Sequence, residues 1–265
     1  MPETSGDQRV AGPRSAPASG GGRRGVLVLG MHRSGTSALT RILNLHGAAL
    51  GEDLMPAARD NPSGFWEHSA AVAIHERLLA RLGMAWDDPR PLPPEWQGGE
   101  PAREALEAID ALIAREFATQ RLWAVKDPRL CRFASLWRRA MEKRGIEANV
   151  VLVTRDPAEV AASLQARDGL PLAVGNLLWG RYLVDALHAA EGLPRRLVHY
   201  GELLHDWRTV IDGVDHALQL GLHRDARVEA ECDRFLSPQL RHHARGADAA
   251  EALVEPLRAA LDGAG

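Results

Sequence analysis

The sequence VLVLGMHRSGTS at residues 26–37 decides the fold of this chain. Its first four residues are apolar and partly β-branched, which is typical of a strand that is buried on both faces. Gly30 ends this run, and apolar residues recur at helical spacing after Ser37. A strand, a glycine-bounded turn and a helix direct backbone N–H groups at an anion, and the helix dipole adds to the attraction. The stretch therefore predicts a phosphate-type binding site at residues 31–37.

The spacing of this loop differs from that of a Walker A loop, in which lysine directly follows the second glycine. Gly30 and Gly35 have the Walker separation, but Thr36 occupies the lysine position and Arg33 is the cation of the loop. An ordinary ATPase would lack the lysine that contacts the β- and γ-phosphates. A P-loop-like kinase or nucleotide hydrolase is therefore disfavoured but stays open, as does a turn with a purely structural role.

A second segment repeats the arrangement of strand, charged turn and helix. Residues 150–163 read VVLVTRDPAEVAAS, in which an apolar run ends at Arg155 and a helix containing Ser163 follows. Asp156, Pro157 and Glu159 are typical of a helix start: a short acceptor, a proline in the first turn and an acid after it.

Taken together, the two segments resemble the sulfotransferases that use 3′-phosphoadenosine 5′-phosphosulfate (PAPS). In that family a K/R-S-G-T loop after the first strand holds the 5′-phosphosulfate of the donor. A later arginine at a strand end and a serine eight residues after it hold the 3′-phosphate. The loop is matched by Arg33, Ser34, Gly35, Thr36 and Ser37, and the later pair by Arg155 and Ser163. The resemblance spans about residues 25–210 and implies a PAPS-dependent sulfotransferase that requires no metal.

The rest of the chain alternates apolar strands with amphipathic helices. Strands are expected at 26–29, 122–125, 149–154 and 197–200, and helices include 69–82, 101–118, 172–190 and 202–220. This alternation predicts a three-layer α/β fold, a mostly parallel sheet flanked by helices, and the resemblance implies a P-loop-like sulfotransferase fold. Arg33, Lys126 and Arg155 each follow a predicted strand end, so we expect them at one edge of the sheet.

Length and composition restrict the class of protein. The 265 residues fit a glycine- and proline-rich disordered tail at 1–24 and one domain at 25–265. The net charge of −3 gives no broad basic surface for nucleic acid, and no apolar run is long enough for a membrane span. Cys131 and Cys232 are too few for a disulfide framework, so a cytoplasmic protein is expected. The oligomeric state is not fixed by the sequence.

Lys126 is the candidate for stabilising charge on the leaving oxygen during transfer. The sulfotransferase family commonly has a lysine at the matching strand end. The branch that acts on small phenols has a K-T-H arrangement there, whereas this chain has Pro128 in the position of the histidine. The resemblance therefore favours the carboxylate-using branches, whose acceptors are mostly carbohydrates or peptides.

The acceptor needs a proton-accepting group within hydrogen-bond reach. Candidates on the loop after the first helix are Glu67, Asp53, Glu52 and His68. Glu67 is preferred because the preceding Phe65 and Trp66 could desolvate its carboxylate and raise its basicity.

Three further features of the sequence leave their roles open. Tyr200 and Trp66 could stack on adenine or on a sugar, although core packing explains each equally well. Arg241, His242 and His243 are adjacent and have no partner at metal-ligand spacing, so we predict no metal site there. A nucleotide-binding module without transfer activity is the non-enzymatic alternative. We expect a sugar or another hydroxylated small molecule as the acceptor.

Overall fold

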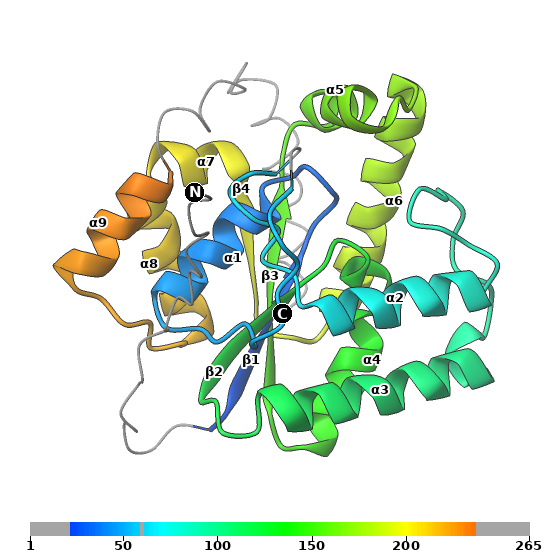
Figure 1. Cartoon of the computed structure of the whole chain (residues 1–265), viewed down its shortest axis with the longest axis horizontal. Coiled ribbons are helices and arrows are strands. Elements are labelled where there is room, and N and C mark those ends of the chain that lie inside the picture. Colours follow the sequence, from blue (N-terminus) through cyan, green and yellow to red (C-terminus); the bar gives the residue numbers. More distant parts are fainter. Residues whose placement is uncertain (1–21, 59–60, 237–265) are drawn as a thin grey trace, which may run out of the picture.

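The computed structural model describes residues 22–58 and 61–236, which form an α/β domain around one parallel sheet (Figure 1). The strand order is β2-β1-β3-β4, and every neighbouring pair is parallel. The strands are β1 (Arg24–Leu29), β2 (Leu122–Lys126), β3 (Glu147–Thr154) and β4 (Arg195–His199). The predicted α/β class and parallel sheet are therefore confirmed.

The apolar run of β1 is buried on both faces of the sheet, as its sequence predicts. β1 lies between β2 and β3, so both of its edges are paired. Val26 and Val28 pack into the core on one face, whereas Leu27 and Leu29 pack into the core on the other. All four side chains are fully buried. Successive residues of the strand thus place their apolar side chains alternately in the two cores.

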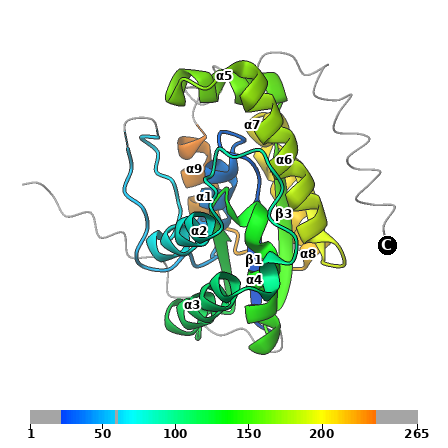
Figure 2. The same ribbon diagram turned by 90° about the vertical axis from the view of Figure 1, so that its right-hand side faces the viewer.

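Helices cover both faces and complete three layers (Figure 1). The face of Val26 and Val28 packs against α1 (Thr36–Leu45), α7 (Tyr200–His205), α8 (Trp207–Leu218) and α9 (Ala226–Phe235). The other face packs against α2 (Ser69–Arg81), α3 (Glu100–Glu116), α4 (Leu130–Lys143), α5 (Pro157–Asp168) and α6 (Leu172–Ala190). Figures 1 and 2 both show α5 beyond the carboxyl end of β3, with α6 returning along the sheet.

The chain differs from the predicted helices in its last third. The helix expected over 202–220 is two helices, because Asp206 has a non-helical conformation, with φ −146° and ψ 78°, and is the N-cap of α8. Its carboxylate accepts hydrogen bonds from the backbone N–H and the hydroxyl of Thr209. This cap satisfies backbone donors that a continuous helix would bond internally. Helix α9 and a short 3₁₀ turn, η1 (Trp96–Gly98), were not predicted.

The first strand begins slightly earlier than the sequence predicts. β1 begins at Arg24, two residues before the apolar run, and Arg23 donates a hydrogen bond to the backbone oxygen of Ala118. Most of the expected tail, residues 1–21, lies outside the described residues. The same holds for Arg241, His242 and His243 and for the helix expected near residues 251–261. None of the helices in the described part combines the length and apolar character that crossing a membrane demands.

Candidate active site

The loop between β1 and α1 is shaped by backbone conformations that favour glycine. Gly30 has φ 155° and Gly35 has φ 91°, and Arg33 between them is also left-handed at φ 68°. A Cβ atom on Gly35 would lie 2.1 Å from Cδ2 of Tyr200. Helix α1 starts immediately afterwards at Thr36, so the N–H groups of its first turn have no intrahelical acceptor. The loop therefore has the geometry of an anion-binding turn.

The two basic segments found in the sequence are in direct contact. Nε of Arg33 donates to Oγ of Ser163 at 2.9 Å, and Nη1 of Arg155 donates to the backbone oxygen of Arg33 at 3.1 Å. Arg155 also pairs with Glu159 at 2.7 Å. These contacts form because β1 and β3 are neighbouring parallel strands whose carboxyl ends share one edge of the sheet.

Lys126 and Glu67 form a buried ion pair beside this loop. The distance from Nζ to Oε1 is 2.5 Å, and the side chains are only 3% and 9% exposed. Nζ also donates to Oγ of Ser37 and to the backbone oxygen of Phe65, both at 3.0 Å. Burial raises the pKa of the Glu67 carboxyl, and the charge of Lys126 lowers it by a smaller amount. The pair therefore places a cation and a carboxylate of raised basicity together in a dry environment.

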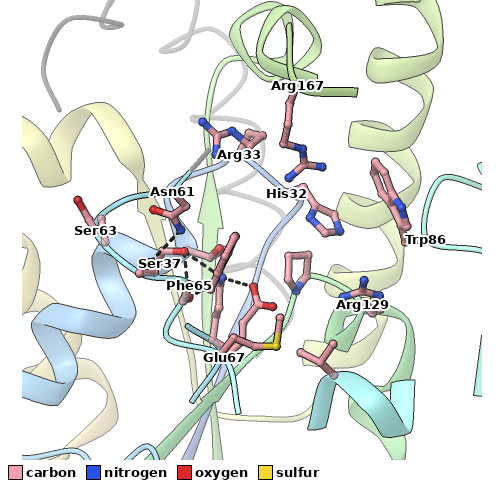
Figure 3. Close-up of a pocket in the computed structure, with 18 of the residues that line it drawn as sticks. His32, Arg33, Ser37, Asn61, Ser63, Phe65, Glu67, Trp86, Arg129 and Arg167 are labelled. Atoms are coloured by element: carbon pink, nitrogen blue, oxygen red, sulfur yellow. Dashed lines mark hydrogen bonds and ion pairs between the residues drawn. The ribbon is translucent and has the colours of Figure 1, made fainter. Parts of the chain in front are cut away.

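A cavity of about 470 Å³ opens between these groups (Figure 3). Its lining includes seven residues predicted from the sequence: Arg33, Gly35, Thr36, Ser37, Glu67, Lys126 and Tyr200. Ser34, Arg155 and Ser163 are not part of the lining. Arg155 and Ser163 contact Arg33 directly, and Ser34 is buried within the loop.

The other candidate bases do not line the cavity. Asp53 is exposed, and its carboxylate accepts a hydrogen bond from the Ser69 hydroxyl at the start of α2. Glu52 is exposed as well. His68 is buried at the N-cap of α2, where Nδ1 accepts from the backbone N–H of Ala70. Of the four candidates, Glu67 alone lies in the cavity lining within the described part of the chain.

The two aromatic candidates have different surroundings. Tyr200 lines the cavity and packs against Gly35, and the Arg155 guanidinium lies 5.3 Å from its ring centroid. Trp66 does not line the cavity; its ring packs under the guanidinium of Arg41 at 4.4 Å.

Several lining residues were given no individual role by the sequence analysis, among them His32, Trp86, Arg129 and Arg167. His32 lies inside the predicted loop at residues 31–37, and Arg129 follows Lys126 by three residues, so the sequence offered a signal for both. Trp86 precedes a proline-rich loop and Arg167 lies in the last turn of α5, and no local pattern connects either residue with a cavity. Over residues 22–58 and 61–236, no group of three or more His, Cys, Asp and Glu side chains is arranged to hold a metal ion.

A chain of buried hydrogen bonds ends at Arg129, which lines the cavity. Nε1 of Trp137 donates to Nε2 of His75, which places the imidazole proton on Nδ1, and Nδ1 lies 2.7 Å from Oδ2 of Asp127. Oδ1 of Asp127 then accepts from Nη1 of Arg129 at 2.9 Å. Burial opposes ionisation of Asp127, but the hydrogen bond from His75 and the charge and backbone N–H of Arg129 outweigh it and lower the pKa of Asp127. The chain thus fixes the orientation of Arg129.

We expect Asp127→Asn to destabilise the protein by about 3–5 kcal/mol, because it leaves the Arg129 cation without its buried carboxylate. Urea unfolding of wild type and variant measures the difference. Asp168→Asn is the matched control, because the pair of Asp168 with Arg167 is partly exposed, at 26% and 20%, and contributes less than a fully buried pair. Equal stability of both variants would contradict the support given to Arg129.

Comparison with known proteins gives a fold but no close relative. No protein-family model and no curated protein sequence matches the chain. The structure is similar to the sulfotransferase domain of the olefin synthase of Synechococcus PCC 7002, with a TM-score of 0.50 and 18% identity over 89% of this chain and 94% of that chain. The chain has the sulfotransferase fold.

Two further solved structures are less similar to this chain. The sulfotransferase domain from the curacin biosynthetic pathway has a TM-score of 0.46 and 16% identity, over 78% of this chain and 77% of that one. A sulfotransferase of Mycobacterium tuberculosis H37Rv has a TM-score of 0.40 and 15% identity, over 80% and 71%.

Proposed function

We propose that the protein is a sulfotransferase that moves the sulfuryl group of PAPS to a hydroxyl or amine of a carbohydrate or another hydroxylated small molecule. The observation that carries the proposal is the contact of Arg33 with both Arg155 and Ser163. A nucleotide phosphorylated at both its 5′ and 3′ positions needs two anion sites at one edge of the sheet, and these residues supply two adjacent groups of donors.

The 5′-phosphosulfate would be held by the loop from Arg33 to Ser37. Its left-handed residues and the first turn of α1 offer backbone N–H groups to an anion. The hydroxyl of Ser34 is buried and lies outside the cavity lining, so its contact with the donor stays a prediction. Because Arg33, Lys126 and Arg155 already supply positive charge, we propose that donor binding needs no metal.

The 3′-phosphate would be recognised by Arg155 and Ser163. Arg155 forms an ion pair with Glu159 at 2.7 Å, which helps to hold the side chain near the turn after β3. Tyr200 lines the cavity next to Arg155 and is the candidate to pack against the adenine.

Transfer breaks the bond between sulfur and the bridging oxygen of the donor and forms a bond from sulfur to the acceptor oxygen. The leaving group is adenosine 3′,5′-bisphosphate. Lys126 and Arg33 would stabilise the negative charge that develops on its 5′-phosphate. Glu67 would accept the proton that the acceptor hydroxyl loses, which needs an ionised carboxylate. The raised pKa of Glu67 fits a base, because a more basic carboxylate accepts a proton more readily.

Calorimetry with adenosine 3′,5′-bisphosphate tests the proposal. We expect binding in the presence of EDTA, at least about tenfold tighter than the binding of ATP with Mg²⁺. Incubation with ³⁵S-labelled PAPS and a panel of sugars then detects transfer. Tighter binding of Mg²⁺-ATP would favour a kinase or hydrolase. Tight bisphosphate binding without transfer to any acceptor would favour a binding module.

A further inference from the structure

The proposed binding of the donor uses no residue from one side of the cavity. Figure 3 shows His32, Trp86 and Arg129 on the side opposite to Ser37, Asn61 and Ser63, with Arg167 above His32. We call these four residues, His32, Trp86, Arg129 and Arg167, the His32–Trp86 face. They line the same cavity as Lys126 and Glu67, so a molecule bound against this face lies beside the proposed reacting groups.

Trp86 is a fixed wall of this face. The hydroxyl of Tyr182 donates to the backbone oxygen of Trp86 at 2.7 Å, and Arg132 donates to the backbone oxygens of Asp88 and Arg90 just after it. The indole ring packs against the His32 ring, with 4.6 Å between centroids. A large aromatic surface held in this way offers apolar contact area at a small cost in conformational entropy.

Arg129 is fixed as well, and it keeps one donor available. Its two terminal nitrogens donate to Asp127 and to Glu76 at 2.9 and 2.8 Å. Nε is buried and has no hydrogen-bond partner among the described residues. Because a buried guanidinium nitrogen without a partner is unfavourable, an oxygen atom supplied by a ligand would stabilise it. The Glu76 carboxylate is 59% exposed, so water screens its charge.

The charges around His32 favour a negative group. Burial lowers the pKa of His32 well below its usual range, and Arg129, Arg167 and Lys126 lower it further against the opposing charge of Asp127. The imidazole is therefore neutral at neutral pH, and its Nε2 has no hydrogen-bond partner among residues 22–58 and 61–236. Arg167 lies over Trp86 at 5.4 Å from the ring centroid. It pairs with the neighbouring Asp168, which also lines the cavity, and the two side chains are 20% and 26% exposed. A bound anion therefore competes with Asp168 for this guanidinium.

We propose that the His32–Trp86 face binds an acceptor that carries a carboxylate or a phosphate monoester next to a flat apolar part. The anionic group contacts Arg167 and Nε of Arg129, and the flat part packs against Trp86. Arginine suits this role because its planar donors match the oxygens of carboxylates and phosphates. The inference rests on the proposed function, because it treats this half of the cavity as the place of the acceptor.

The test uses three small probes of similar size and different charge: benzoate, phenyl phosphate and benzyl alcohol. The full-length protein is saturated with adenosine 3′,5′-bisphosphate, and probe binding is followed by ligand-detected NMR. We expect benzoate or phenyl phosphate to bind at least about tenfold more tightly than benzyl alcohol. The comparison of the two anions distinguishes a carboxylate site from a phosphate site. Equal binding of all three probes, or no binding of any, would overturn the proposal.

Variants then assign the binding to the His32–Trp86 face. We expect Arg167→Gln to remove most of the preference for the anions and Trp86→Ala to weaken all three probes. Arg103→Gln, which changes an exposed arginine on α3, is the matched control and should leave probe binding unchanged. Unchanged anion binding by Arg167→Gln would overturn the proposal.

Binding of adenosine 3′,5′-bisphosphate distinguishes failure of the proposed function from failure of this inference. A wild-type protein that fails to bind it contradicts the proposed function and with it this inference. Bisphosphate binding without an anion preference leaves the proposed function standing and contradicts the inference alone.

Discussion

Lys126→Met is expected to lower the rate of sulfuryl transfer by about 10²-fold or more, since it removes a cation from the developing charge of the leaving group. Lys126 is 3% exposed and is held by Glu67, Ser37 and Phe65, so its ammonium group is already oriented before any substrate binds. Preorganised charge in a dry site stabilises a transition state more than a mobile surface charge does. Turnover of ³⁵S-labelled PAPS with any acceptor found in the panel measures the effect.

The same variant is expected to change the pH dependence of transfer. Lys126 lowers the pKa of Glu67 against the larger raising effect of burial, so its removal raises that pKa further. The carboxylate must be ionised to accept a proton, and the rise of activity with pH should therefore move to higher pH.

Lys143→Met is the matched control for this variant, because Lys143 is 71% exposed at the last residue of α4 and does not line the cavity. It is expected to retain wild-type turnover and pH profile. Near-normal turnover by Lys126→Met would show that its ammonium group takes no part in transfer. Thermal unfolding and bisphosphate binding of each variant distinguish loss of catalysis from loss of the fold.

The sequence predicted the α/β class and the parallel sheet because the signals for them are local. Residues 26–29 form one unbroken apolar run followed by a glycine, and this pattern specifies a buried central strand and a turn wherever the rest of the chain lies. Arg33 and Arg155 could be expected at one edge of the sheet because parallel strands end on the same side. Their contact through the backbone oxygen of Arg33 follows from the pairing of β1 with β3.

The rest of the cavity depends on contacts between distant segments, which no local pattern encodes. Trp86 reaches the cavity only because Tyr182 and Arg132, both from distant helices, hold the backbone of its loop. Asp53 and Glu67 belong to the same loop between α1 and α2. Glu67 accepts a hydrogen bond from Lys126, whereas Asp53 is exposed and contacts Ser69 at the start of α2. The division of the predicted helix at Asp206 likewise follows from a capping hydrogen bond that competes with helix continuation.

Arg155→Ala is expected to weaken binding of adenosine 3′,5′-bisphosphate by about 10–100-fold, because a charge-assisted hydrogen bond contributes about 1.5–3 kcal/mol. AMP lacks the 3′-phosphate, so its affinity should change little, and the preference of the protein for the bisphosphate should largely disappear. Ser163→Ala should also weaken binding of the bisphosphate, by a smaller factor, because it removes a neutral hydroxyl donor and not a charged one. Calorimetry with both nucleotides, with Arg103→Ala as the exposed control, measures the preference directly.

The comparison with AMP is decisive because Arg155 also has a supporting contact. Its guanidinium donates to the backbone oxygen of Arg33, so the substitution could loosen the loop that binds the 5′ end. A loosened loop would weaken AMP and the bisphosphate by the same factor, whereas loss of 3′-phosphate recognition weakens only the bisphosphate. An equal loss for both nucleotides would therefore assign Arg155 to the support of the loop and would leave the choice of donor to other residues.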